Sequence, residues 1–566
     1  MDRVKPQTGL HISLLGMGLY RLLRKRLHTR YVTAALATTV FLISYAVLSG
    51  NGVSTQRAVG MCLIYLFADV TGYAYDMLNA LGIVVLVLLW KNPFLLSYSG
   101  FVFSVMAVIA IGVGANVLLE WEHSWKRRQQ AGEETIKKTF FSRQKEGILV
   151  SFAIQLFTIP LVAYSYYEIP VYAMLINLFV LAVVNGLLGL TVLGMIVGMA
   201  FLPAGRVLFA PCGWMLDSYR FLCEVSLKIP GAQRITGKPA HMRIFWYYLG
   251  LGVFLLAIYA CARRNEKHKD CRETADLCVS RRKKRLQGIV FSCFIAFLLL
   301  FLLFPQKKSF EIDFLDVGQG DGIYLCTGGG TSMFIDGGST DVKQVGKYRI
   351  LPFLKAKGVS EISYWFVSHT DTDHVSGLKE VLVSGYRVEY LVFAKAVEKE
   401  AKTKELAELA RSHGTKVLYM QAGDTVRSKR AAMRCLYPKA SDKAEDVNDL
   451  CLVLQFEEGD IRALFGGDIS TDVEEQLLRR RKWDKVLIFK ADHHGSRYAN
   501  AEALLKCIRP EITVASAGKD NRYGHPSPDA VQRIKESGSR FFCTIEGGRI
   551  RVRVIENKLV CETYVK

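Results

Sequence analysis

Acidic residues are scarce in the first 304 residues. Long polar stretches are scarce there too. This part carries 15 Asp and Glu against 32 Lys and Arg, whereas the remainder carries 37 against 41. The net charge of +21 therefore arises mainly from the first part. Long uncharged apolar blocks exclude a water-soluble protein there. The basic excess indicates first the sidedness of membrane segments and only second a polyanionic ligand.

Cysteine pairs of the C-x-x-C type are missing from the second part. Its six cysteines are scattered, and the other seven of the chain lie in or near apolar segments. Disulfides would be permitted if the second part faced the outside of the cell. We expect buried free thiols instead, so cysteine gives no indication of function.

Composition places a domain boundary between Phe304 and Pro305. Residues 1–304 predict a polytopic α-helical membrane domain, because a bilayer core of about 30 Å needs roughly 20 helical residues. Seven apolar blocks approach this length: 31–48, 97–119, 148–166, 171–187, 189–209, 245–262 and 286–304. Residues 58–89 suffice for two short spans, and residues 10–23 would end another. In residues 305–566, short strand-like runs alternate with amphipathic helices.

Three basic loops predict the orientation of these spans. They comprise residues 21–30, 126–145 and 263–285. Basic loops favour the cytoplasmic side, and four expected spans lie between each successive pair. The last span then carries the chain outward, so residues 305–566 are predicted on the outer face of the cytoplasmic membrane.

Several polar residues interrupt the apolar blocks. The clearest are Arg57, Asp69, Asp76 and Asn177. Facing lipid they would be costly, so we expect them to face the bundle interior or a water-filled path. Hydrogen bonding between helices alone would explain them equally well.

The most informative motif is residues 368–374, with the sequence SHTDTDH. It follows the strand-like segment 362–367 and places two histidines and two aspartates on one short loop. A simple polar turn is one interpretation. The other is a site for one or two divalent cations, since clustered carboxylates would otherwise repel one another.

Three later segments support the metal interpretation. Each ends an apolar run with ligand-type residues beside glycine: FGGD at 465–468, KADHHGS at 490–496 and YGHP at 523–526. Such strand ends are expected to converge on one site.

These motifs, in this order, resemble the metallo-β-lactamase fold and, more narrowly, the ComEC family of competence proteins. The narrower resemblance comes from FLDVGQGDG at 314–322, FIDGG at 334–338, the loop with Asp371, and NDLCLVL at 448–454. Looser membrane landmarks include TGLHIS at 8–13, which contains His11, and VSTQRA at 53–58. The fold implied for residues 305–566 is αβ/βα. The family usually has a further N-terminal region, so we expect the chain to start within the family's second region.

The resemblance implies a role for each candidate residue. Phosphodiester cleavage suits two cations, with Asp373, His374 and Asp468 as the catalytic positions. The implied metal ligands are His369, Asp371, Asp373, His374, Asp468 and one or both of His493 and His494. Lys490, Ser496 and His525 would hold a phosphate. Supporting positions would be Asp316, Gln319, Asp321, Asp336 and Asn448, and the channel candidates are His11, Arg57, Asp69, Asp76 and Asn177.

Two features affect the expected metal. Most relatives of the fold carry another histidine between the 368–374 loop and the aspartate that bridges the two ions, which would be Asp468 here. In this chain only His413 lies between them. The first metal site is therefore expected to be weak. Asp371 stands where most relatives have a histidine, and a carboxylate oxygen is a harder ligand than an imidazole nitrogen. Mn²⁺ therefore competes with Zn²⁺ as the expected ion.

The resemblance implies DNA uptake across the cytoplasmic membrane in natural transformation. One strand would pass through the membrane domain, while a metal-dependent nuclease domain degrades the other strand of duplex DNA at the outer face. Implied partners are membrane lipid, a DNA receptor, a cytoplasmic motor and further copies of the chain. The alternatives are a DNA channel with an inactive hydrolase domain, or a membrane-anchored phosphodiesterase or esterase of the cell envelope.

Overall fold

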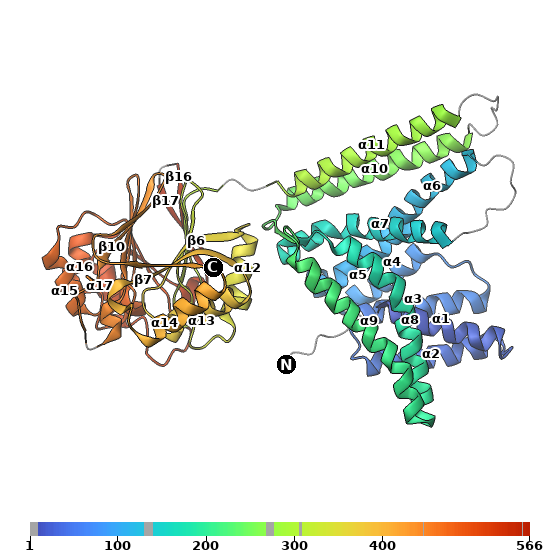
Figure 1. Cartoon of the computed structure of the whole chain (residues 1–566), viewed down its shortest axis with the longest axis horizontal. Helices are drawn as coiled ribbons and strands as arrows, with labels where there is room; N and C mark the ends of the chain where they lie inside the picture. The colour runs from blue at the N-terminus through green and yellow to red at the C-terminus, as the bar shows by residue number, and fades with distance from the viewer. Residues whose placement is uncertain are drawn as a thin grey trace. The chain divides into compact units, whose positions relative to one another are not determined.

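The computed structural model divides the chain into two compact units, Met1–Phe304 and Pro305–Lys566. It describes residues 9–129, 140–267, 277–304, 308–444, 446–556 and 558–565. Figure 1 shows that the first unit is mostly helical and that the second contains the two large sheets.

The first unit consists almost entirely of helices. These are α1 (Gly9–Lys25), α2 (Tyr31–Leu48), α3 (Val53–Thr71), α4 (Met77–Lys91), η1 (Pro93–Ser97), α5 (Ser99–Ile109), η2 (Ala110–Ala115), α6 (Asn116–Gln129), α7 (Phe140–Tyr166), α8 (Ala173–Ala200), α9 (Leu202–Lys228), α10 (His241–Lys267) and α11 (Leu277–Leu302). Strands β1 (Glu168–Pro170) and β2 (Gln233–Ile235) pair antiparallel.

Five segments of this unit, among the described residues, are helical, long and apolar enough to cross a membrane. They are Tyr31–Leu48, Ser99–Trp125, Lys145–Tyr166, His241–Arg264 and Arg282–Leu302. Residues 58–89, predicted to suffice for two short spans, form parts of two helices, α3 and α4, neither of which is among these five. Residues 130–139 and 268–276 of the predicted basic loops lie outside the described residues.

The expected helix boundary at residue 188 is wrong. Helix α8 continues through Gly186 and Gly189 to Ala200. Glycine weakens a helix but does not end one that is packed, whereas proline favours the first turn of a new helix. Pro203 lies in the first turn of α9, so the break falls at Phe201.

The second unit is built on two sheets. One has the order β17 (Lys558–Thr563), β16 (Ile550–Ile555), β3 (Glu311–Phe314), β4 (Gly322–Cys326), β5 (Ser332–Asp336), β6 (Glu361–Phe366), β7 (Arg387–Ala394) and β8 (Lys416–Met420). The other has the order β15 (Arg540–Cys543), β14 (Ile512–Ala515), β13 (Ile488–Lys490), β12 (Ile461–Phe465), β11 (Val453–Glu458), β10 (Ala431–Tyr437) and β9 (Thr425–Ser428).

Helices and short turns complete this unit. They are η3 (Gly346–Ile350), α12 (Leu351–Ala356), α13 (Thr372–Val383), η4 (Lys395–Val397), α14 (Ala401–Ser412), η5 (Val447–Leu450), α15 (Thr471–Arg480), η6 (Asp492–Gly495), α16 (Glu502–Ile508), α17 (Pro528–Glu536) and α18 (Thr544–Gly547).

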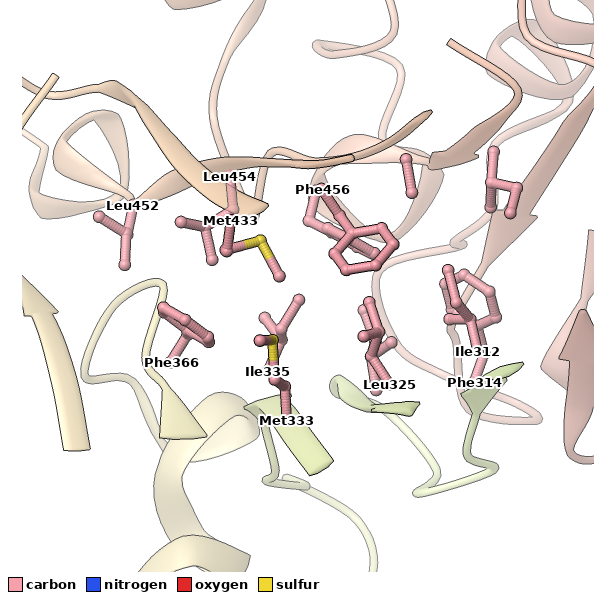
Figure 2. Close-up of a cluster of buried hydrophobic side chains, with 14 of the residues drawn as sticks. Ile312, Phe314, Leu325, Met333, Ile335, Phe366, Met433, Leu452, Leu454 and Phe456 are labelled. Carbon is pink, nitrogen blue, oxygen red and sulfur yellow. The ribbon is translucent and has the colours of Figure 1, made fainter. Parts of the chain in front are cut away.

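The main core lies between the two sheets. Strand residues alternate between faces, so Ile312 and Phe314 of β3 point inward, as do Leu454 and Phe456 of β11. Figure 2 shows these side chains facing one another across the interface. Two further cores lie on the outer faces, where α12–α14 cover the first sheet and α15–α17 cover the second. The unit is therefore a four-layer αβ/βα sandwich, as the sequence predicts.

The strand directions determine where a site can form. Strands β5, β6 and β7 run parallel, and so do β12, β13 and β14. The carboxyl ends of parallel strands meet at one edge of a sheet, where ligand sites of α/β proteins generally lie.

Candidate metal centre

The predicted site residues leave the sheets at these carboxyl ends. Asp336 ends β5, and the loop 368–374 connects β6 to α13. On the second sheet, Asp468 follows β12, and Lys490 ends β13 just before the histidines of η6. The topology therefore gathers residues that are far apart in the sequence, such as Asp336 and His494, which are separated by 158 positions.

Asp468 lies at the centre of the cluster. Its Oδ2 atom is 3.4 Å from His374 Nε2 and 3.3 Å from His494 Nε2. The Oδ2 atom of Asp373 lies 3.7 Å from the same nitrogen of His494. His493 Nε2 is farther from Asp468, at 3.9 Å, and its side chain is one-third exposed.

Two overlapping groups of side chains can hold a metal ion. The first comprises Asp321, His374, Asp468 and His494, all buried, and the second His369, Asp373 and His374. Within each group the ligand atoms lie within 4.8 Å of one another. Both groups contain His374.

Unpartnered buried atoms test whether these residues fit a cation. Nε2 of His374, Nε2 of His494, Oδ1 of Asp468 and Oδ1 of Asp321 are buried without a hydrogen-bond partner. Buried polar atoms rarely remain unpaired without a reason such as an ion. Imidazole and carboxylate are the ligands of Zn²⁺ and Mn²⁺, so the donor set fits a divalent metal.

Asp336 fixes the orientation of His374. Its Oδ2 atom is 3.0 Å from His374 Nδ1, and it accepts a hydrogen bond of 2.8 Å from Ser368 Oγ. Its Oδ1 atom accepts a 2.7 Å hydrogen bond from the Ser368 N–H. A carboxylate on the far nitrogen of a ligand histidine fixes its tautomer and ring plane.

The backbone around the cluster is strained. Asp336, His493 and His494 have φ angles of 58°, 49° and 54°. Non-glycine residues in this left-handed region cost free energy and concentrate at functional sites. Glycine permits close approach on the opposing strand, because a Cβ atom on Gly466 would lie 2.1 Å from Asp492 Oδ1.

The carboxylates dominate the electrostatics of the two central histidines. Burial alone would lower the pKa of His374, but Asp468 and Asp336 outweigh burial and hold this pKa well above its usual range. In His494, Asp468 and Asp321 likewise outweigh burial and raise the pKa to about 9. Although burial opposes it, the two histidines hold the pKa of Asp468 well below its usual range.

The pKa values of the two more peripheral histidines, His369 and His525, shift in the opposite direction. Burial, together with His374, lowers the pKa of His369 to about 4. Burial, together with His494 and His493, lowers the pKa of His525 to about 4. Both imidazoles are therefore neutral at pH 7 and able to bind a cation or donate one N–H.

Asp371 does not join either group. As the residue preceding α13, it points outward, and its Oδ1 atom accepts a 2.9 Å hydrogen bond from Lys402 Nζ. Its Oδ2 atom is 3.9 Å from His369 Nε2. His413 directly follows α14 and is exposed.

The predicted phosphate-binding residues occupy different places. Lys490 is buried and forms an ion pair with Asp321. His525 is half-buried, with its ring 5.5 Å from that of His493. Ser496 is buried, and its hydroxyl accepts a 3.3 Å hydrogen bond from the Tyr498 N–H.

The remaining supporting residues lie around the cluster. Gln319 is buried, and its Oε1 atom accepts a 3.2 Å hydrogen bond from the Gly518 N–H. Asp316 lies farther out and is paired with Arg349 at 2.8 Å. Asn448 lies in η5, where its carbonyl accepts a 3.1 Å hydrogen bond from the Cys451 N–H.

Two contributors were not assigned to the cluster from the sequence. Asp321 was predicted as a supporting residue, yet it belongs to the four-residue group. Ser368 was given no role, although it binds Asp336 through both its N–H and its hydroxyl. The position of Ser368 directly before His369 was the available signal.

The polar residues of the helical unit are mostly satisfied by local partners. Arg57 donates a 2.7 Å hydrogen bond to Ser104 Oγ, which joins α3 to α5. Asp69 accepts a hydrogen bond from the Tyr20 hydroxyl. Asp76 caps α4 by accepting a 2.7 Å hydrogen bond from the Asn79 N–H. Among the described residues, Arg57 forms no ion pair with either aspartate.

The other two channel candidates lie on separate helices. Asn177 is exposed on α8, and His11 belongs to α1. These positions neither support nor oppose a polar path through the unit.

Comparison with known proteins shows which proteins the chain resembles. Residues 8–260 match the family described as competence protein. The chain is 25% identical over 564 residues to ComE operon protein 3 of Bacillus subtilis, an alignment that covers 96% of this chain and 67% of that protein. It is 24% identical over 591 residues to recombination protein 2 of Haemophilus influenzae, covering 98% and 68%.

Solved structures similar to the chain include metallo-β-lactamase-fold proteins. YhfI of Bacillus subtilis has 11% identity and a TM-score of 0.31, covering 43% of this chain and 100% of YhfI. Zn²⁺-bound PqqB of Methylobacterium extorquens has 11% identity and a TM-score of 0.29, covering 41% and 87%. The two-sheet topology of the second unit is the metallo-β-lactamase fold.

Metal binding to this chain should release protons. A ligand histidine must be deprotonated, and His494 has a pKa of about 9 before an ion binds. The affinity for Mn²⁺ should therefore rise between pH 6.5 and 8.5, by about tenfold per pH unit for each proton displaced. Titration calorimetry in two buffers of different ionisation enthalpy measures that proton directly. An affinity independent of pH, without proton release, would exclude His494 as a ligand.

Proposed function

We propose that this chain takes part in DNA uptake across the cytoplasmic membrane during natural transformation. Its second unit would be a divalent-metal-dependent phosphodiesterase that degrades the strand not transported. The observation that carries the proposal is the buried group of unpartnered imidazole and carboxylate atoms around Asp468. It occurs in a chain whose first unit matches the competence family.

The chemistry follows from the donor set. His374, Asp468 and His494 would hold the metal, together with Asp373 or Asp321, whereas Asp336 keeps His374 in its binding tautomer. When bound, a divalent cation activates water and neutralises charge in phosphoryl transfer. Mn²⁺ and Zn²⁺ both suit these ligands.

The half-exposed side of the cluster suits the substrate. His493 and His525 lie there with their rings 5.5 Å apart. Because His525 is neutral at pH 7, it can donate one N–H to a phosphate oxygen without bringing a charge that repels the cation. We assign the phosphate-binding role to His525, while Ser496, with its buried hydroxyl, would support the η6 turn.

The helical unit would form the DNA path. Five described segments have the length and apolarity of membrane spans, and the basic residues of the three loops favour a cytoplasmic location. With this orientation the second unit lies outside, where incoming duplex DNA arrives. A DNA receptor, a cytoplasmic motor and further copies of the chain would act with it.

A nuclease assay on the purified full chain tests the proposed chemistry. Cleavage of DNA should require an added divalent cation and show no strong sequence preference. Asp373→Asn, His374→Ala and Asp468→Ala should each lower the rate on the order of 100-fold or more, since each removes a charge-stabilising group.

His413→Ala is the matched control for this assay, because His413 is exposed and outside the cluster. It should cleave like the wild type. Equal rates for the wild type and all three cluster variants would show that the cluster is not the active site. Cleavage by none of the proteins under any metal would favour a channel with an inactive hydrolase domain.

Accessibility in intact protoplasts tests the orientation. Added protease should cut the second unit and spare the basic loop 263–285, because the last span carries the chain outward. Fragments are identified by antibodies against each unit, and detergent-opened protoplasts serve as the control. Cleavage in the loop with protection of the second unit would place the hydrolase in the cytoplasm.

An Arg57 variant distinguishes a helical unit that forms a DNA path from one that only anchors the chain in the membrane. The Arg57 guanidinium group is half-buried between α3 and α5 and bonds Ser104. Arg57→Ala should lower DNA internalisation several-fold without changing cleavage by the purified chain, whereas Ser104→Ala retains the charge and should have a smaller effect. The amount of chain in the membrane is measured alongside. Wild-type uptake by stable Arg57→Ala would favour the anchor interpretation.

A further inference from the structure

We propose that the centre takes one divalent cation and that the ammonium group of Lys490 supplies the positive charge a second cation would bring. This inference deepens the proposed function and rests on its metal-binding step alone. It revises the expectation of two ions, which came from the family resemblance.

The two metal-capable groups cannot both be complete. Each requires His374. One nitrogen of that ring, Nδ1, lies 3.0 Å from Asp336 Oδ2, so only Nε2 is free for an ion. A histidine nitrogen binds a single cation. The group that contains His374, Asp468 and His494 has the larger number of buried, unpartnered donor atoms.

The second group lacks the ligands that would complete it without His374. Asp371, the expected ligand, is drawn outward by Lys402 at 2.9 Å, and its side chain is 46% exposed. His413, the remaining histidine of the interval, directly follows α14 and is exposed. Only His369 and Asp373 remain, and two protein ligands are too few for a tight Zn²⁺ or Mn²⁺ site.

Lys490 brings the missing positive charge into the cluster. It is 1% exposed and among the largest fully buried side chains of the described residues. It extends from the end of β13, and its Nζ atom is paired with Oδ2 of Asp321. The other oxygen of Asp321 faces the cluster without a partner, and it is 3.7 Å from His494 Nδ1.

The balance of charge agrees with this arrangement. Hydrogen bonds with Ser368 and His374 compensate the Asp336 carboxylate. Asp321, Asp373 and Asp468 carry three further negative charges, which one divalent cation and one ammonium group neutralise. A buried charge without compensation is strongly destabilising. Two divalent cations in addition to Lys490 would leave the site with excess positive charge.

Metal content of the full chain in lipid nanodiscs tests the inference. The protein is equilibrated with Mn²⁺, freed of loosely bound ions and analysed by mass spectrometry for metal per chain. The wild type should retain one ion. Lys490→Met frees both oxygens of Asp321 to bind the first ion with Asp468 and His494. His374 then becomes available to His369 and Asp373, and because one positive charge is removed, this variant should retain two ions.

Two control variants make the result interpretable. Lys490→Met with Asp321→Asn removes the pair without leaving a net charge, and it should retain one ion even if the single variant folds poorly. Lys379→Met removes a lysine whose partner, Glu405, lies outside the cluster, and it should also retain one ion. Circular dichroism of each variant checks the fold.

Three results would overturn the inference, and they are distinguishable from one another. Two ions in the wild type would restore the two-ion centre. One ion in a folded Lys490→Met variant would remove the role of the lysine. No ion in the wild type would contradict the metal centre itself and with it the proposed function.

Discussion

The concentration of buried negative charge at one edge of the two sheets constrains the rest of the second unit. Asp321, Asp336 and Asp468 are each at most 5% exposed, and their carboxylates lie within a few ångströms of two histidines. Such a group is stable only if hydrogen bonds, an ammonium group and a cation compensate it. Ser368, His374 and Lys490 supply part of this compensation, and the unpartnered donor atoms mark what is left for a metal.

The packing of the second unit holds these buried carboxylates close together. A tightly packed apolar core between the sheets holds the strand ends in place, and helices on both outer faces bury the sheets on their other sides. Left-handed backbone at Asp336, His493 and His494 is strained in isolation, yet neighbouring strands over-determine it.

Much of the second unit could be predicted from its sequence, because strand alternation and the order of the motifs both depend on local patterns. The sequence does not predict that the side chain of Asp373 points inward and that of Asp371 outward. These directions depend on the start of α13 at Thr372, which turns two residues only two positions apart to opposite sides. Likewise, the choice of His494 as the nearer histidine depends on two consecutive left-handed residues, and the burial of Lys490 depends on its pairing with Asp321, 169 positions away. In the first unit, apolar composition predicted the helices but not the continuation of α8 past Gly189.

The central claim is that the buried cluster is a metal centre, and anomalous diffraction from crystals equilibrated with Mn²⁺ tests it most directly. The account predicts an anomalous peak about 2 Å from His374 Nε2, His494 Nε2 and a carboxylate oxygen of Asp468. Crystals saturated with Mn²⁺ that show no peak among these three atoms, or show one only elsewhere in the chain, would contradict it.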